Sequence, residues 1–130
     1  MSNTTTRVRV VAGLIQNDIG EYLVAKRSSV MSHSGKWEFP GGKVESAETD
    51  EAAIIRELLE ELGIRVRPQS TVGEFLDTQA RPQILLIGMR CIIEHGQPKP
   101  IEHAALRWVS PQGLRTMDMC RSDIALLDLI

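Results

Sequence analysis

Three glutamates recur at a spacing that would bring their carboxylates together. On a helix, Glu57, Glu60 and Glu61 fall within one sector of roughly 100°. Like charges at these spacings destabilise an isolated helix by a few tenths of a kcal/mol per pair, so the cluster gains stability only beside a cation. Glutamates on the polar side of an amphipathic helix are usually only solvated, and the three residues alone favour that simpler interpretation.

Oxygen ligands of this kind select hard divalent cations, so the carboxylates predict a Mg²⁺ site in which Mn²⁺ would substitute. A backbone carbonyl of the Gly41-Gly42 turn would complete the ligand shell. Bound Mg²⁺ bridges acidic side chains to phosphate oxygens and polarises phosphorus towards attack by water. The chemistry to expect is therefore hydrolysis of a phosphate compound.

Length and composition limit the remaining choices. A chain of 130 residues predicts one domain over residues 1–130, and 42% hydrophobic with 25% charged residues is typical of a globular protein. The formal charge of −2 excludes a general attraction to long nucleic acids. We therefore expect a small-molecule partner, and a chain that is a monomer or a homodimer.

Cysteine usage and apolar segments bear on the compartment. Cys91 and Cys120 form no CxxC motif and are expected to be reduced packing residues. The first ten residues lack the apolar core of a signal peptide, and the longest strongly apolar stretch, residues 84–89, is too short to span a bilayer. These features predict a cytoplasmic protein without membrane attachment.

The elements that must position the glutamates follow from periodicity and from residues that break regular structure. Residues 7–16 and 22–27 predict a hairpin, and residues 36–42, with Pro40 and two glycines, predict an irregular loop. Residues 49–62 predict a helix that begins at Thr49 or Ser46 and stops at Gly63. Its predicted apolar face comprises Ala52, Ile55, Leu59 and Leu62.

The second half of the chain predicts further strands and two short helices. Strands are expected at residues 64–67, 72–76, 84–94 and 106–109, the first two separated by Pro68. Ser110 and Pro111 predict the start of a short helix, and Ser122 is expected to cap a last helix through residue 130. This order predicts an α/β (α+β) fold in which helices cover a mixed sheet.

A longer pattern surrounds the three glutamates. Residues 42–64 read Gly-x5-Glu-x7-Arg-Glu-Leu-x-Glu-Glu-x-Gly-Ile without a departure. Here the chain resembles the Nudix hydrolase family, whose signature box it matches at every fixed position. The preceding segment WEFPGGKVE also resembles the approach to the box in MutT-type nucleoside triphosphate pyrophosphohydrolases. The resemblance covers most of the chain and implies an α/β/α sandwich around a mixed sheet, with the box as loop-helix-loop.

The resemblance also implies roles for residues of the box and of a late loop. The metal ligands it implies are Gly41, through its carbonyl, and Glu57, Glu60 and Glu61. Arg56 would orient a box carboxylate, and Glu48 would support the junction between loop and helix. Glu102, six residues before Trp108, would bind metal or act as general base, with a plain surface charge as an equal alternative. His103 is a rival base ranked below it, and His33 and His95 rank lower still, because loop histidines are more often solvated.

Three further residues bear on the substrate that the resemblance implies, a nucleoside triphosphate cleaved to the monophosphate and pyrophosphate. Arg27 matches a substrate-contacting position, although it would equally suit a surface ion pair. Phe39, like Trp37, would stack on the base or pack the loop. Asp123 stands where 8-oxo-dGTP diphosphatases carry Asn. An ionised Asp would accept hydrogen bonds from the amine of cytosine or from N1 and N2 of guanine. Alternatively, Asp123 would only form part of the N-terminus of a helix.

The substrate choice thus stays open between oxidised purine and cytosine triphosphates, in nucleotide-pool sanitising. Two competing hypotheses remain. One keeps the metal chemistry on a nucleotide sugar, a dinucleoside polyphosphate or an RNA 5′ end. The other is a non-catalytic nucleotide-sensing module, which the complete set of box carboxylates disfavours.

Overall fold

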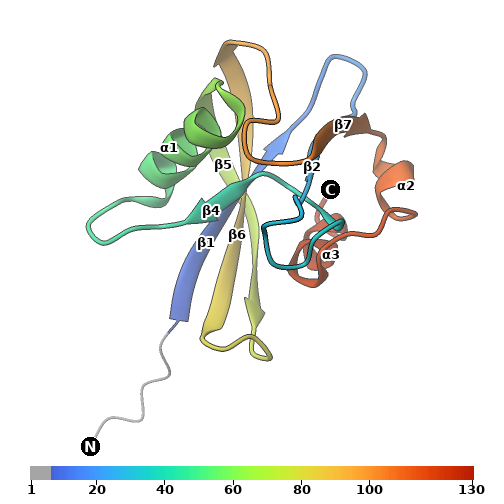
Figure 1. The fold of residues 1–130 in the computed structure, drawn as a ribbon. Helices are drawn as coiled ribbons and strands as arrows, with labels where there is room; N and C mark the ends of the chain where they lie inside the picture. Colours follow the sequence, from blue (N-terminus) through green and yellow to red (C-terminus); the bar gives the residue numbers. More distant parts are fainter. Residues whose placement is uncertain (1–6) are drawn as a thin grey trace, which may run out of the picture.

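The computed structural model describes residues 7–130, so the expectation about the N-terminus falls in part outside the described residues (Figure 1). None of the helices in this range has the length and apolarity that crossing a bilayer requires. The elements follow in the order β1 (Arg7–Ile15), β2 (Tyr22–Lys26), β3 (Trp37–Glu38), β4 (Gly41–Lys43), α1 (Asp50–Leu62), β5 (Arg65–Asp77), β6 (Gln83–His95), β7 (Ala105–Val109), α2 (Pro111–Leu114) and α3 (Arg121–Leu127).

The strands form two sheets. The larger has the order β4-β1-β6-β5 and is mixed, because β1 and β6 run parallel, whereas the smaller is antiparallel with the order β3-β2-β7. In Figure 1, α1 lies on one side of the long strands and α2 and α3 lie on the other. The predicted α/β class, with helices around a mixed sheet, is confirmed.

The predicted hairpin of the first two strands is wrong. β1 pairs with β4 and β6, β2 pairs with β3 and β7, and the two strands share only an isolated bridge between Gln16 and Tyr22. The turn between them does reverse the chain, with Asn17 Oδ1 accepting from the backbone of Glu21 at 2.9 Å. That turn carries the chain from one sheet to the other, which local sequence does not encode.

Alternate residues of β1 supply two separate hydrophobic cores. Val11 and Ile15 pack in one cluster with Leu58 of α1, whereas Leu14 packs in the other with Leu126 of α3. All five side chains are at most 1% exposed. Burying an aliphatic side chain of this size stabilises the fold by about 1.5–3 kcal/mol, so both helices are held mainly by these contacts.

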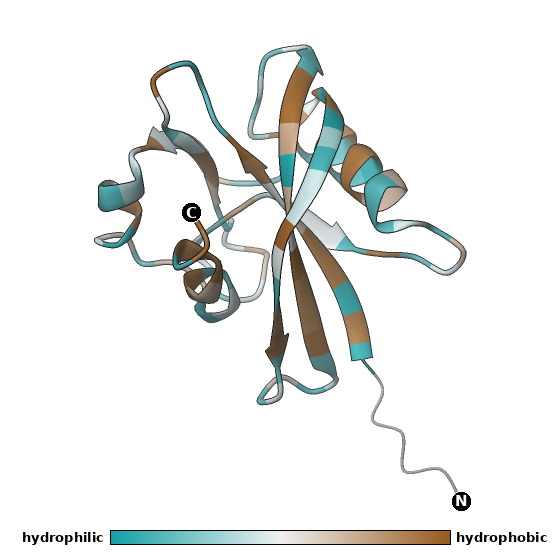
Figure 2. Ribbon diagram, turned by 180° about the vertical axis from the view of Figure 1, so that it is seen from behind, coloured by the Kyte–Doolittle hydropathy of each residue, from teal (hydrophilic) through white to brown (hydrophobic). Residues whose placement is uncertain are grey.

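The helix α1 has the predicted ends but not the predicted buried face. Thr49 accepts from Ala52 N at 3.0 Å as the N-cap, and Gly63 ends the helix with a φ of 69°. Ile55 and Leu59, expected in the core, are 36% and 49% exposed. The buried positions are instead Ala53, Ile54, Leu58, Glu61 and Leu62. Figure 2 shows both hydrophobic and hydrophilic stretches along this helix.

The segment expected as an irregular loop contains two short strands. β3 pairs with β2 in the smaller sheet, and β4 pairs with β1 in the larger one. Between them, the carbonyl of Pro40 accepts from Gly13 N of β1 at 2.7 Å. Residues 37–43, called the crossing segment below, therefore pass from one sheet to the other. This path brings the backbone of Gly41 and Gly42 against α1.

Two other boundaries differ from expectation. β5 continues through Pro68, because it is an edge strand and its register shifts between Pro68 and Ser70, where a missing N–H is tolerated. The last helix ends at Leu127, and Cys120 rather than Ser122 occupies its N-cap without a capping hydrogen bond from a side chain. The Ser122 hydroxyl donates instead to Asp77 Oδ2 at 3.1 Å.

Candidate active site

Glu57 and Glu61 lie one turn apart on the inner side of α1, where the helix meets β4. The Glu57 side chain is 14% exposed and Glu61 is 8% exposed, whereas the Glu60 side chain, at 57%, points towards solvent. The three carboxylates therefore share one sector of the helix, as the spacing predicts, but only those of Glu57 and Glu61 are largely shielded from solvent. The interpretation of the cluster as a solvated helix face does not describe Glu57 and Glu61.

Glu61 has the least compensated charge of the group. Its Oε1 is buried and has no hydrogen-bond partner among residues 7–130. Burial raises the pKa of Glu61 to about 9, and the negative charges of Glu57, Glu38 and Glu102 contribute to the shift, which a hydrogen bond with the Gly41 backbone opposes. A buried carboxylate without a partner is unfavourable, so this position is suited to a bound cation.

Two glycines let the β4 backbone approach β1 and α1. A Cβ at Gly41 would overlap the Val11 carbonyl, and a Cβ at Gly42 would overlap the carboxylate of Glu57. Both positions require glycine because of space rather than because of a positive φ. The close approach places the Gly41-Gly42 backbone beside the carboxylates of α1, as the metal-site prediction requires.

Arg56 links the loop before α1 to the inner carboxylates. Its Nε and Nη2 donate to the two oxygens of Glu48 at 2.7 and 2.9 Å, and Nη1 donates to Glu57 Oε1 at 3.0 Å. Nη2 also donates to the Lys43 carbonyl at 2.9 Å. Hydrogen bonds from Arg56 and from the Glu45 backbone lower the pKa of Glu48 to about 2. Arg56 therefore joins Glu48, in the loop before α1, to Glu57 on the helix.

Glu102 and His103 lie in the loop before β7 in different environments. Glu102 is exposed, and its charge reaches Glu57 and Glu61. His103 is only 5% exposed, so the expectation of a solvated loop histidine is wrong. Its Nε2 lies 2.8 Å from Glu38 Oε2. This contact pairs His103 with Glu38, whereas Glu102 acts electrostatically on the carboxylates of α1.

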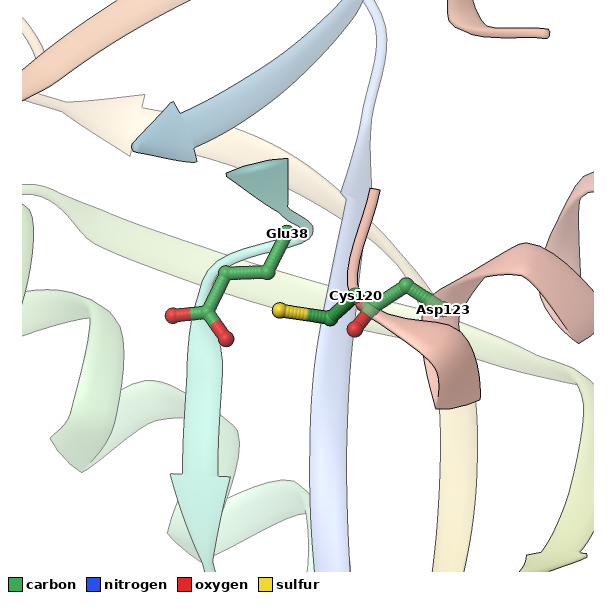
Figure 3. A group of neighbouring side chains, drawn as sticks. All are labelled: Glu38, Cys120 and Asp123. Atoms are coloured by element: carbon green, nitrogen blue, oxygen red, sulfur yellow. The ribbon is translucent and has the colours of Figure 1, made fainter. Parts of the chain in front are cut away.

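Glu61 of α1 lines a cleft of about 950 Å³. The wall of this cleft also includes Glu38, Cys120 and Asp123, whose ligand atoms lie within 4.8 Å of one another (Figure 3). Glu38 was not singled out by its sequence position, and only its place in WEFPGG marks it. Because Arg27 and His103 occupy both oxygens of Glu38, and burial raises the pKa of Cys120 to about 12, we do not assign a metal to this group.

Asp123 is buried in the wall of this cleft. It is 6% exposed, and its Oδ1 accepts from Phe39 N at 3.1 Å. Burial raises the pKa of Asp123 to about 8, with a contribution from the charge of Glu38. At neutral pH its carboxyl group is therefore mostly protonated and both donates and accepts, as an amide does.

The remaining candidate residues are distributed as follows. Arg27 lines the cleft and donates to Glu38 Oε1 at 2.8 Å, and the Phe39 ring, 2% exposed, packs edge-on against Tyr22. The Trp37 ring lies about 6 Å from the cations of Lys26 and Arg107. Both cysteines are free, as expected: Cys91 is buried in the core and Cys120 lines the cleft. His33 also lines the cleft, and His95 is exposed at the end of β6.

Comparisons with known proteins agree with this geometry. The NUDIX domain matches residues 6–127. The chain is 38% identical over 125 residues to CTP pyrophosphohydrolase of Escherichia coli, which covers 93% of this chain and 89% of that protein. It is 41% identical over 58 residues to 8-oxo-dGTP diphosphatase of Escherichia coli, 45% of each protein. The structure of a MutT protein from Methanosarcina mazei superposes with a TM-score of 0.86 at 27% identity, covering 98% and 94% of the two chains.

The fold, the complete box and these relatives define the class of the protein, a hydrolase that acts on phosphorus anhydrides. Residues 37–43 and α1, which are close in sequence, carry most of the residues of the box, and this explains why a local pattern predicts the class. The chain belongs to the Nudix family.

Proposed function

We propose that the protein is a Mg²⁺-dependent nucleoside triphosphate pyrophosphohydrolase that removes unwanted nucleotides from the cytoplasmic pool. One observation supports this function above the others. Glu61, buried among other carboxylates with one oxygen that has no partner in the described residues, lines the same cleft as Asp123. A site for a cation and a polar group suited to a base thus share one cleft.

The proposed metal ligands are Glu57, Glu60, Glu61, Glu102 and the carbonyl of Gly41. Nudix hydrolases generally use a divalent cation such as Mg²⁺, and the oxygen-only donors here fit that choice. When bound, the cation polarises the phosphate and lowers the pKa of water. Arg56 holds Glu57 through Nη1, so the ligand is oriented before substrate binds. We propose Glu102, the exposed carboxylate of the group, as a base for the attacking water.

The proposed base pocket lies around Asp123, with Arg27 and Phe39 beside it. A protonated carboxyl group donates one hydrogen bond and accepts another. Cytosine offers an acceptor at N3 beside the donor at N4, and 8-oxoguanine offers an acceptor at O6 beside the donor at N7. On that same edge unmodified guanine offers two acceptors, O6 and N7, because its N7 carries no hydrogen. Asp123 in its protonated form thus fits cytosine or 8-oxoguanine better than unmodified guanine, which agrees with the names of the two relatives.

A substrate panel tests the proposal. CTP, dCTP, 5-methyl-dCTP, 8-oxo-dGTP and the ordinary triphosphates are incubated with Mg²⁺, and pyrophosphate and monophosphate are measured. We expect equal amounts of the two products and a preference for a cytosine or 8-oxoguanine substrate. Release of inorganic phosphate alone, or cleavage only of nucleotide sugars, dinucleoside polyphosphates or RNA 5′ ends, would exclude the proposed reaction. No hydrolysis with either Mg²⁺ or Mn²⁺ would instead favour a sensing module.

Matched variants of α1 connect the activity to the site. Glu60→Gln and Glu61→Gln are each expected to abolish pyrophosphate release, because each removes a negative charge from the metal ligands. Glu51→Gln is the control, since Glu51 is exposed in the first turn of the same helix and occupies a variable position of the box. Circular dichroism checks that all three proteins are folded.

A further inference from the structure

The wall of the cleft contains another buried carboxylate, Asp77, the last residue of β5. Asp77 is 4% exposed and accepts four hydrogen bonds. Its Oδ1 accepts from the backbone of Gln79 and Ala80 at 3.0 and 3.3 Å. Its Oδ2 accepts from Arg121 Nη2 at 2.7 Å and from the Ser122 hydroxyl at 3.1 Å. The carboxylate therefore joins the β5–β6 turn to the start of α3.

Asp77 differs from the other buried acids of the cleft in being fully compensated. Burial alone would raise its pKa, but hydrogen bonds from Arg121, Gln79 and Ser122 outweigh that effect and hold the pKa below the ordinary value. Asp77 is thus a stable ionised anchor at neutral pH. Asp123, by contrast, has the raised pKa of a group that is not compensated in this way.

The start of α3 depends on this anchor. The N-cap Cys120 makes no capping hydrogen bond from its side chain, and the helix has only seven residues. Such a short helix is not stable by itself, so contacts from outside decide where its first turn lies. Arg121 and Ser122, which Asp77 holds, are the two residues immediately before Asp123.

The opposite side of the same turn meets the crossing segment. Asp123 Oδ1 accepts from Phe39 N, and the Asp123 carboxyl group lies beside that of Glu38. The first turn of α3 is thus held on one side by Asp77 of the larger sheet and on the other by the backbone next to β3. If the contacts with Asp77 were lost and the first turn of α3 moved, the hydrogen bond between Asp123 and Phe39 N would change as well.

From these contacts we propose that Asp77 is a positioning residue for base recognition, which holds the first turn of α3 so that Asp123 faces the cleft. Asp77 lines the cleft together with Arg121 and Ser122. It acts through Asp123 rather than by contact with the reacting phosphate. The kinetic part of the inference rests on the proposed function, whereas the structural part does not.

Asp77→Ala and Asp77→Asn test the structural part without substrate. The Phe39 amide donates to Asp123, so its hydrogen exchange, followed by NMR, reports whether Asp123 stays in place. We expect exchange at Phe39 to accelerate about tenfold or more in Asp77→Ala and less in Asp77→Asn, which keeps one of the two acceptor oxygens. Asp128→Ala is the control, since Asp128 forms an exposed ion pair with Arg115 at the other end of α3. Unchanged exchange at Phe39 in both Asp77 variants would overturn the inference.

A double-mutant cycle tests the kinetic part. We expect Asp77→Ala to raise KM for the preferred triphosphate, with kcat changed less than about twofold, and to reduce the preference between bases by roughly tenfold. In an Asp123→Asn background the same substitution should change the preference by less than about twofold, because the group it positions is already altered. Equal effects in both backgrounds, or a loss confined to kcat, would contradict the inference. If the wild type hydrolyses no nucleotide, the proposed function fails while the exchange experiment still decides the role of Asp77.

Discussion

The carboxylate of Glu57 fills the space that a side chain at Gly42 would need. Glu57 is in turn held by Arg56 Nη1, so it is confined between a guanidinium and a backbone. The nearby Gly41 is confined differently, because the atoms that crowd it belong to the backbone of Val11. Two neighbouring glycines therefore serve two purposes, one in the site and one in the sheet.

Substitution of these glycines should separate the two purposes. In Gly42→Ala the flexible Glu57 side chain moves away, so we expect kcat/KM to fall about 10- to 100-fold with little change in Tm. In Gly41→Ala the β1 backbone must move, so we expect destabilisation of roughly 1–3 kcal/mol or failure to fold. Thermal unfolding and steady-state kinetics measure both. Equal losses of stability in the two variants would refute this division.

Ala47→Gly is the control for a general effect of substitutions close to β4, because Ala47 lies in the loop between β4 and α1. Ala47 has a φ of 68°, a conformation that glycine adopts more readily than alanine. We expect unchanged activity and a Tm equal to or above that of the wild type.

Arg56→Lys should impair activity although it keeps the charge. A lysine ammonium cannot reproduce the fork that binds both oxygens of Glu48 and also reaches Glu57. We expect kcat/KM to fall tenfold or more, on the order seen for residues that orient metal ligands. The matched control is Arg9→Lys, which alters a two-pronged pair with Asp50 on the exposed side of the same helix. That control should retain full activity, because exposed pairs contribute at most about 1 kcal/mol.

Glu61→Gln should stabilise the protein when a chelator removes divalent cations. Burial raises the pKa of Glu61 to about 9, so without a cation the carboxyl group must take up a proton on folding at neutral pH. The substitution replaces it by an amide of similar shape that needs no proton. We expect a gain of about 1 kcal/mol or more, visible as an increase in Tm of several degrees. Added Mg²⁺ should raise the Tm of the wild type but not that of the variant. A variant that melts below the wild type in chelator would contradict this account of Glu61.

Asp123 should make stability depend on pH. Its pKa is about 8 in the folded protein and near 3.8 in the unfolded chain, so the folded state keeps a proton that the unfolded state has released. The contribution of Asp123 to stability therefore falls as pH rises from about 4 to about 8. The amide of Asp123→Asn does not titrate, so the stability of this variant lacks that pH dependence. The difference in Tm between the variant and the wild type should therefore grow over that interval and then level off. Asp128→Asn, at an exposed residue, should show no such trend.

The sequence was sufficient for the elements whose determinants are local. Thr49 and Gly63 mark the ends of α1, and the box brings Glu57, Arg56 and Glu61 together through helical geometry alone. The buried face could not be determined in the same way. Ile54 with Leu58 and Ile55 with Leu59 form two adjacent stripes with the same spacing, and only the position of the sheet decides which one is buried.

Longer-range features required the structure. No local signal predicts that the turn after β1 leads into a second sheet, or that His103 is buried against Glu38. Asp77 illustrates the same limit. Its four donors come from its own turn and from a helix more than forty residues later, so no spacing in the sequence announces them.

The crossing segment has a consequence for the length of the substrate. In the proposed function, Glu38 lies beside the base and Gly42 beside the metal, and three residues separate them. This segment is held at both sheets by strand pairing and in between by the Pro40 carbonyl. Under that proposal it fixes the distance between the base and the reacting phosphorus. Nucleotides that place a shorter or longer spacer between the two should bind at one end only, and so act as inhibitors rather than as substrates.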